Sequence, residues 1–206
     1  METISFELNG QTLEALVGET ILQAADRAGV ADIPRLCYKE GYRTDGNCRS
    51  CVVEIEGERV LAPSCCRYPQ QGMKVNSKSE RAVHSQKMVL ELLLADMPES
   101  GKSPYTPNSE LDELVEKLGL SKPRFSRRVQ PAFDNSHPAM SVNLDTCIQC
   151  TRCVRACREV QVNDVIGMAY RGSHVEIVFD FGDPMGDSTC VACGECVQAC
   201  PTGALM

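Results

Sequence analysis

The stretch CIQCTRCVRAC, which runs from Cys147 to Cys157, places four cysteines at the spacing C-x2-C-x2-C-x3-C. The same spacing returns in CVACGECVQACP, from Cys190 to Pro201. Together the two runs hold eight of the 13 cysteines in this chain of 206 residues. Closely spaced cysteines are typical of metal sites or of disulfide frameworks, so the spacing and the context have to decide between the two.

The N-terminal sequence favours metal over disulfides. METISFELNG (1–10) has no basic region followed by an apolar stretch, so no secretory signal is expected. Disulfides are rare in proteins that stay in the cytosol. We therefore expect a cytoplasmic protein whose cysteines bind metal.

The spacing of the two runs predicts two [4Fe–4S] clusters that share ligands between the runs. Three cysteines at i, i+3 and i+6 can wrap three corners of one cluster, whereas the fourth cysteine of each run ligates the other cluster. The two ligand sets would be Cys147, Cys150, Cys153 and Cys200, and Cys157, Cys190, Cys193 and Cys196. Structural zinc is the alternative, but zinc sites use two separated C-x2-C pairs and give no role to the further cysteines. We predict a bacterial-type 2[4Fe–4S] ferredoxin-like domain over residues 141–206.

The N-terminal region contains a different cysteine set, with the spacing C-x10-C-x2-C-x13-C. Its members are Cys37, Cys48, Cys51 and Cys65. Plant-type ferredoxins bind a [2Fe–2S] cluster with a C-x4-C-x2-C loop and a distant fourth cysteine, and the loop here is longer. It contains Gly41 and Gly46, which let the backbone bend tightly. The set predicts one [2Fe–2S] cluster, with zinc as the alternative; Cys66 competes with Cys65 for the fourth position.

The residues around this second set predict a small mixed domain over 1–78. Strands are expected at 3–8, 12–17, twice within 52–62, and at 73–75. Asn9-Gly10 is a hairpin turn signal between the first two strands. A helix is expected to begin after Thr20, a suitable N-cap, and to end at Gly29. This order of elements matches a β-grasp domain.

Residues 79–140 carry no cysteine and are expected to connect the two cluster domains. Helical spacing over 80–97 ends at Pro98, and 110–119 predicts a second short helix after a loop rich in Ser and Pro. An extended linker is expected over 120–140. The fold class is thus α+β: an N-terminal β-grasp [2Fe–2S] ferredoxin-like domain, a helical connector, and a C-terminal 2[4Fe–4S] ferredoxin-like domain.

Charge and hydropathy argue against several classes of protein. The net charge is −7 and no segment is strongly basic, which argues against nucleic-acid binding; the basic patch KPRFSRR (122–128) is interpreted as a solvated linker or a docking surface. The longest apolar run, VLELLLADM (89–97), is too short to span a membrane. There is no dinucleotide-binding or Walker A motif, and no self-contained active site is predicted.

Four arginines lie beside predicted cluster ligands: Arg49, Arg152, Arg155 and Arg158. They either raise the reduction potential of a cluster through charge and hydrogen bonding or are ordinary solvated residues. The sequence leaves both interpretations open.

The N-terminal motifs CRSCVVEIEG (48–57), SC (64–65) and GMKV (72–75) resemble the complex I large iron–sulfur subunit and its relatives. These include [FeFe]-hydrogenases and the alpha subunits of cytosolic NAD-dependent molybdenum or tungsten formate dehydrogenases. In that group the fourth [2Fe–2S] ligand precedes the Gly-Met pair by the register that selects Cys65. Many members carry next a [4Fe–4S] site with one His and three Cys. Residues 67–146 contain no cysteine, so this cluster is expected to be absent.

The closing region is most similar to the formate dehydrogenase alpha subunits, over SHPAMSVNLDTCIQCTRCVRACREVQVNDVIG (136–167) and FDFGDPMGDSTCVACGECVQACPTGAL (179–205). In such subunits a further [4Fe–4S] domain and a molybdopterin domain follow. The resemblance implies a module that relays single electrons between a metal–pterin formate site and a flavin/NAD-binding (diaphorase) partner. The alternatives are an electron-transfer subunit of another oxidoreductase, such as an NADH-linked reductase or a hydrogenase, and a zinc-bound structural protein.

Overall fold

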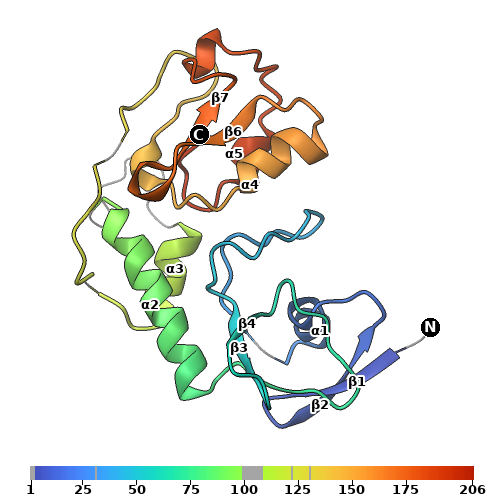
Figure 1. Cartoon of the computed structure of the whole chain (residues 1–206). Helices are drawn as coiled ribbons and strands as arrows, with labels where there is room; N and C mark the ends of the chain where they lie inside the picture. Colours follow the sequence, from blue (N-terminus) through green and yellow to red (C-terminus); the bar gives the residue numbers. More distant parts are fainter. Residues whose placement is uncertain (1–2, 31, 99–108, 122, 130) are drawn as a thin grey trace. The chain divides into compact units, whose positions relative to one another are not determined.

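The computed structural model describes residues 3–30, 32–98, 109–121, 123–129 and 131–206. The chain divides into two compact units, residues 1–38 with 44–90, and residues 39–43 with 91–206 (Figure 1). Two parts of the predictions lie outside the described residues: residues 99–108, which belong to the predicted loop rich in Ser and Pro, and residue 122 of the basic patch. The domain boundaries inferred from the sequence, after residues 78 and 140, stay a prediction.

The first unit is built on a five-stranded sheet. Its strands are β1 (Thr3–Leu8), β2 (Gln11–Leu16), β3 (Val52–Ile55), β4 (Ala62–Pro63) and β5 (Lys74–Asn76). They lie in the order β2-β1-β5-β3-β4, with β1 and β5 parallel and the other pairs antiparallel. Asn9 and Gly10 both have positive φ, as a tight hairpin turn requires. The predicted β-grasp order is confirmed.

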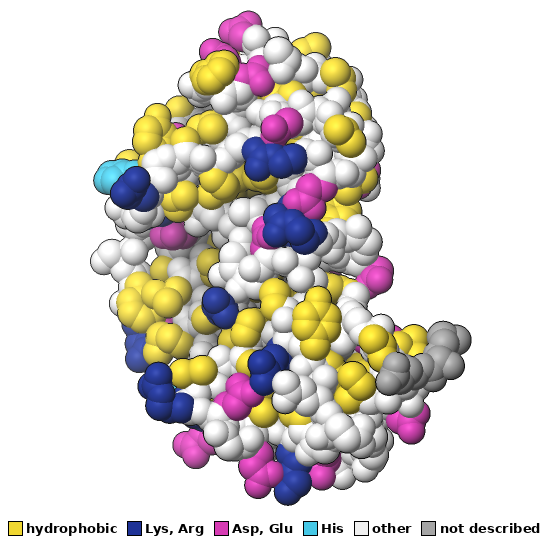
Figure 2. Space-filling view, turned by 45° about the vertical axis from the view of Figure 1, so that its right-hand side comes forward, with side chains coloured by type: hydrophobic (Ala, Val, Ile, Leu, Met, Phe, Trp, Pro, Cys, Tyr) yellow, Lys and Arg dark blue, Asp and Glu magenta, His cyan; other side chains and the backbone are white. Residues whose placement is uncertain are grey.

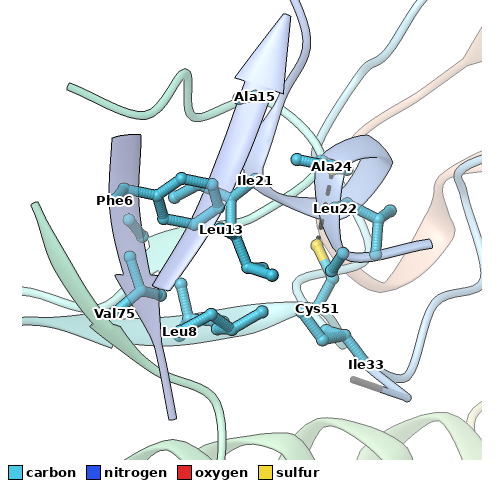
Figure 3. Packing of buried hydrophobic residues seen from close by; sticks show 14 of the residues in the cluster. Phe6, Leu8, Leu13, Ala15, Ile21, Leu22, Ala24, Ile33, Cys51 and Val75 are labelled. Carbon is cyan, nitrogen blue, oxygen red and sulfur yellow. Dashed lines mark hydrogen bonds between the residues drawn. The ribbon is translucent and has the colours of Figure 1, made fainter. Parts of the chain in front are cut away.

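Helix α1 (Ile21–Ala28) covers the sheet and closes the core of this unit. Thr20 caps it in a capping box with Gln23, and Gly29 ends it in the left-handed conformation, as predicted. Figure 3 shows how the helix and the strands contribute to one apolar cluster. Its labelled members include Phe6, Leu8, Leu13, Val75, Ile21 and Leu22.

One strand is much shorter than predicted. We expected two strands within 52–62, but β4 comprises only Ala62 and Pro63 and pairs with the first two residues of β3. The Glu58 N–H bonds back to the Ile55 carbonyl oxygen at 3.0 Å, and Gly57 has φ of +82°. This tight turn carries residues 58–61 out of the ladder.

Both connector helices are present as α2 (Glu80–Asp96) and α3 (Glu110–Lys117). Ser109 caps α3: its hydroxyl accepts a hydrogen bond from the Asp112 N–H, and the Asp112 carboxylate accepts one from the Ser109 N–H. The apolar face of α3 is buried at Leu111 and Val115. The short helix is therefore held by a cap at its start and by burial along one side.

Beyond α3, the second unit contains the short helices α4 and α5 and a hairpin. Strands β6 (Ile166–Ala169) and β7 (Glu176–Phe179) pair antiparallel, and α4 (Arg152–Arg155) packs against β6 and α5 (Glu195–Ala199) (Figure 1). A π-helical turn, Ala156–Val160, follows α4 directly. Turns of this kind are rare and are concentrated at functional sites. In the parts of the chain that are described, no helix has the length and apolar character needed to cross a membrane.

Candidate metal centres

The first centre is a cavity in the second unit that four cysteines line. They are Cys147, Cys150, Cys153 and Cys200. The remaining wall is mostly apolar, with Leu144, Ile148, Ile177 and Leu205. Three of the thiols thus come from the first cysteine run and one from the end of the second, which is the grouping predicted from the spacing.

The backbone of the first run turns so that these thiols face inward. Gln149 and Thr151 both adopt positive φ, at 49° and 61°, a conformation that only a few per cent of non-glycine residues show. The Ala204 N–H lies 3.2 Å from Cys200 Sγ and donates to it. Strained loops and N–H groups directed at sulfur are what a loop wrapped around an anionic cluster requires.

The second centre is a separate cavity in the same unit, lined by the other four cysteines. They are Cys157, Cys190, Cys193 and Cys196. The N–H groups of Val165 and Ala192 donate to Cys157 Sγ and Cys190 Sγ, at 3.3 and 3.4 Å. Again one thiol comes from one run and three from the other, so each cavity needs both runs.

The donor sets fit iron–sulfur clusters chemically. Burial, followed by the charge of neighbouring thiols, raises the pKa of Cys150 and Cys196 to about 12, and burial raises that of Cys147 to about 11. Four thiolates in one apolar cavity repel one another, so they need a positively charged metal among them. Sets of four converging cysteines are the usual ligands of [4Fe–4S] clusters. The role of each individual cysteine as a ligand stays a prediction.

The third centre lies in the first unit, at the loop between α1 and β3 and the segment after β4. Cys51 Sγ lies 3.4 Å from Cys65 Sγ, and the Cys37 N–H donates to Cys48 Sγ at 3.4 Å. Hydrogen bonds from the thiols of Cys48 and Cys65 lower the pKa of Cys37. The four thiols predicted to bind [2Fe–2S] therefore converge.

Cys66 lies at the edge of this group. Its Sγ is 3.6 Å from Cys65 Sγ and only half-buried, whereas Cys65 is fully buried and contacts Cys51. A Cβ added at Gly46 would lie 2.8 Å from Cys66 Sγ, and Gly46 has φ of +62°. A glycine at position 46 therefore permits the left-handed backbone and leaves room for Cys66. The burial of Cys65 and its contact with Cys51 favour Cys65 over Cys66 as the fourth member of the ligand group.

Three of the arginines beside cluster cysteines differ in environment. Arg158 is exposed and pairs with Asp164 on the surface. Arg155 is buried and donates to the carbonyl oxygens of Cys150 and Thr151 at 3.2 and 3.3 Å. Arg152 is also buried and forms a bidentate ion pair with Glu110 of α3. Sequence reasoning did not single out Glu110, because it is one of several acids that open a helix.

Comparison with known proteins agrees with these three centres. Residues 1–80 match the family of the 2Fe-2S iron-sulfur cluster binding domain. Residues 132–204 match the family of the 4Fe-4S dicluster domain. The chain thus carries the fold and the cofactors predicted for it, one [2Fe–2S] cluster and two [4Fe–4S] clusters.

Curated relatives resemble nearly the whole chain. It is 35% identical over 216 residues to the NADP-reducing hydrogenase subunit HndD of Solidesulfovibrio fructosivorans, across 100% of this chain and 36% of that protein. It is 33% identical over 178 residues to the mitochondrial NADH-ubiquinone oxidoreductase 78 kDa subunit of Candida albicans, across 84% of this chain and 25% of that protein. The chain thus spans little more than a third of these relatives at most.

The chain spans a larger share of one protein of known structure. In the crystal structure of an NAD+-reducing [NiFe]-hydrogenase in the H2-reduced state, one chain superposes with a TM-score of 0.86 at 30% identity. The match covers 98% of this chain and 86% of that one. The chain carries a 2Fe-2S domain followed by a 4Fe-4S dicluster domain, and it belongs to the family that includes subunits of NADH-quinone oxidoreductases and NAD-reducing hydrogenases.

Proposed function

We propose that this chain is an electron-transfer module that carries single electrons between a flavin/NAD-binding partner and a separate catalytic site. The observation that carries the proposal is the gathering of twelve cysteines into three groups of four. When bound, the clusters of such sites accept and release one electron at a time. The chain itself holds the clusters, spaces them and limits their contact with water.

We assign the ligands group by group. The [2Fe–2S] cluster is held by Cys37, Cys48, Cys51 and Cys65. The first [4Fe–4S] cluster is held by Cys147, Cys150, Cys153 and Cys200, and the second by Cys157, Cys190, Cys193 and Cys196. The convergence of each set on its own cavity or thiol group supports this assignment.

The residues around each cavity tune the clusters. Ile148, Ile177 and Leu205 exclude water from the first cavity, and a low dielectric strengthens every charge interaction inside it. The N–H groups directed at Cys157 and Cys200 stabilise negative charge on sulfur, so they favour the reduced cluster. The chain therefore acts by setting the reduction potentials of its clusters.

For the catalytic partner, we propose a metal–pterin site that oxidises formate or reduces CO2. The resemblance of residues 136–167 and 179–205 to formate dehydrogenase alpha subunits supports this choice. Acidic, basic and apolar side chains are interspersed on the face shown in Figure 2, so that face offers both apolar and charged contacts to protein partners.

A hydrogenase or another NADH-linked reductase is the second candidate. The match that covers 86% of a chain of an NAD+-reducing [NiFe]-hydrogenase favours it, and it fits the module about as well. In either case the flavin/NAD partner is the same kind of protein, and only the substrate of the catalytic partner differs.

Metal analysis and EPR spectroscopy test the electron-transfer module. The anaerobically purified chain should contain about ten iron atoms and as many sulfides, the sum of the three clusters. After reduction we expect one rhombic [2Fe–2S] signal and two interacting [4Fe–4S] signals. Zinc without sulfide, or a single cluster species, would overturn the proposal.

The catalytic partner is tested in the complex purified from the native host through a tag on this chain. Formate, H2 or NADH is added anaerobically, and reduction of the clusters is followed by EPR. We expect formate and NADH each to reduce them. Reduction by H2 but not by formate would replace the formate assignment with a hydrogenase.

A further inference from the structure

An ion pair joins helix α3 to the first residue of α4, within the cysteine run of the first [4Fe–4S] site. Arg152 lies between Cys150 and Cys153, and only 5% of its side chain is exposed. Its Nη1 and Nη2 donate to Glu110 Oε1 and Oε2 at 2.7 and 2.8 Å. Such bidentate pairs are the strongest and most directional of the charged hydrogen bonds.

The same acidic residue also contacts the second cysteine run. The Glu110 N–H donates to the carbonyl oxygen of Pro201 at 3.0 Å, and Pro201 follows Cys200 directly. Glu110 thus bonds one residue beside a cysteine of each run, and the first cavity needs both runs because three of its cysteines come from one and Cys200 from the other.

Two features hold the first turn of α3, and with it Glu110, in place. Ser109 is buried and closes a capping box with Asp112. Leu111, the next residue after Glu110, is fully buried. The carboxylate is therefore presented from an anchored helix end.

We propose that Glu110 is a positioning residue of the first [4Fe–4S] site, where it ties the two cysteine runs together and offsets the positive charge of Arg152. This inference rests on the proposed function, because it requires a cluster in the first cavity. A buried cation next to a cluster favours the reduced state, since reduction adds negative charge. The Glu110 carboxylate, whose side chain is 48% exposed, offsets part of that effect, so the pair tunes the potential at which the first cluster accepts an electron.

The test is an EPR-monitored redox titration of the full chain under anaerobic conditions. In E110Q the charge of Arg152 is no longer offset, so the potential of the first cluster should rise. In R152M the carboxylate remains beside the site, so the potential should fall. The double variant should return close to the wild-type value. Opposite shifts that cancel are the signature of charge, and structural loosening alone would not produce them.

Two further variants separate the effect of charge on the potential from the effect of the contacts that hold the two cysteine runs together. Glu113, three residues further along α3, is exposed as Glu110 is; E113Q removes the same charge and should leave the potential close to that of the wild type. R152K keeps the charge but loses the planar two-donor contact, so the potential should change little while iron is lost to a chelator faster. For E110Q we expect roughly tenfold faster iron loss, as is usual when a residue that supports a metal ligand is removed.

Three outcomes decide the matter. Opposite shifts in E110Q and R152M support the inference. Shifts in the same direction, or none in a chain that holds both [4Fe–4S] clusters, overturn it and leave the proposed function intact. A wild-type chain without iron and sulfide overturns the proposed function and this inference with it.

Discussion

The two [4Fe–4S] cavities arise from the same cysteine spacing but differ in the exposure of one thiol. In the first, Cys150 and Cys153 are each 8% exposed, and the wall is formed by Leu144, Ile177 and Leu205. In the second, Cys157 and Cys196 are just as buried, but Cys193 is exposed and Val191, which also lines the cavity, is 62% exposed. The spacing therefore defines which thiols converge, whereas the surrounding segments define how far each thiol is exposed to solvent.

The covering segments explain the difference. The first cavity is closed by residues after Cys200: Ala204 and Met206 form backbone hydrogen bonds with Asn143 and Ser141, which sets Leu205 opposite Val142. The second cavity is bordered by the loops 190–194 and 162–165, in which Val162 and Ala192 have positive φ and are exposed. We expect the first cluster to be protected and the second to be the one that reacts with agents in solution.

The largest expected effect comes from replacing the one cysteine that each run contributes to the cavity lined mainly by the other run. C157S should abolish the second cluster although Cys157 belongs to the first run, and C200S should abolish the first. Each variant should lose about four iron atoms, measured by iron analysis together with EPR of the remaining cluster. C66S is the control and should keep all three clusters. Loss of the first cluster in C157S would show that the runs do not share ligands.

One residue in each cavity wall, Leu205 in the first and Val191 in the second, should contribute very differently to stability. L205A removes a buried side chain from the first wall and should lower the free energy of unfolding by about 2–4 kcal/mol. V191A shortens an exposed side chain of the second wall and should cost less than about 0.5 kcal/mol. Anaerobic thermal unfolding of the cluster-loaded chain measures both. Equal effects would mean that Val191 is as buried as Leu205 in solution.

The clusters should also differ in their resistance to reagents. When an oxidant such as ferricyanide is added to the loaded wild-type chain, the second cluster should be destroyed roughly tenfold faster, by analogy with the outer-shell effects on metal sites. The decay of each EPR signal gives the two rates, and the C157S and C200S variants identify which signal belongs to which cavity. Faster loss of the first cluster would contradict the difference in exposure.

The smallest effect extends the comparison to the [2Fe–2S] loop of the first unit. G46A forces a Cβ into the left-handed conformation and against Cys66 Sγ, and should destabilise the loop by about 1–2 kcal/mol. Adding C66A removes the sulfur and should restore only part of the loss, because the backbone strain remains. Thermal unfolding and the [2Fe–2S] EPR signal report the result. Full recovery in the double variant would assign the whole cost to the steric contact.

Much of the fold followed from local signals. The Asn9-Gly10 turn, the Thr20 cap and the Gly29 end of α1 were all predicted, since each depends on residues within a few positions of one another. The second strand within 52–62 was predicted too long. Its residues 58–61 have suitable side chains, but the tight turn at Gly57 takes them out of the ladder.

By itself, the sequence determined the chemistry of this protein: the spacing of its cysteines predicts two [4Fe–4S] sites and one [2Fe–2S] site, although spacing alone does not choose between Cys65 and Cys66. Only the tertiary structure decided the surroundings of those groups. The contact of Glu110 with Arg152 spans 42 residues, and the approach of Cys66 to Gly46 joins two loops. Such contacts, and the exposure of Cys193 in one cavity but of no thiol in the other, depend on how distant segments pack, which no local pattern records.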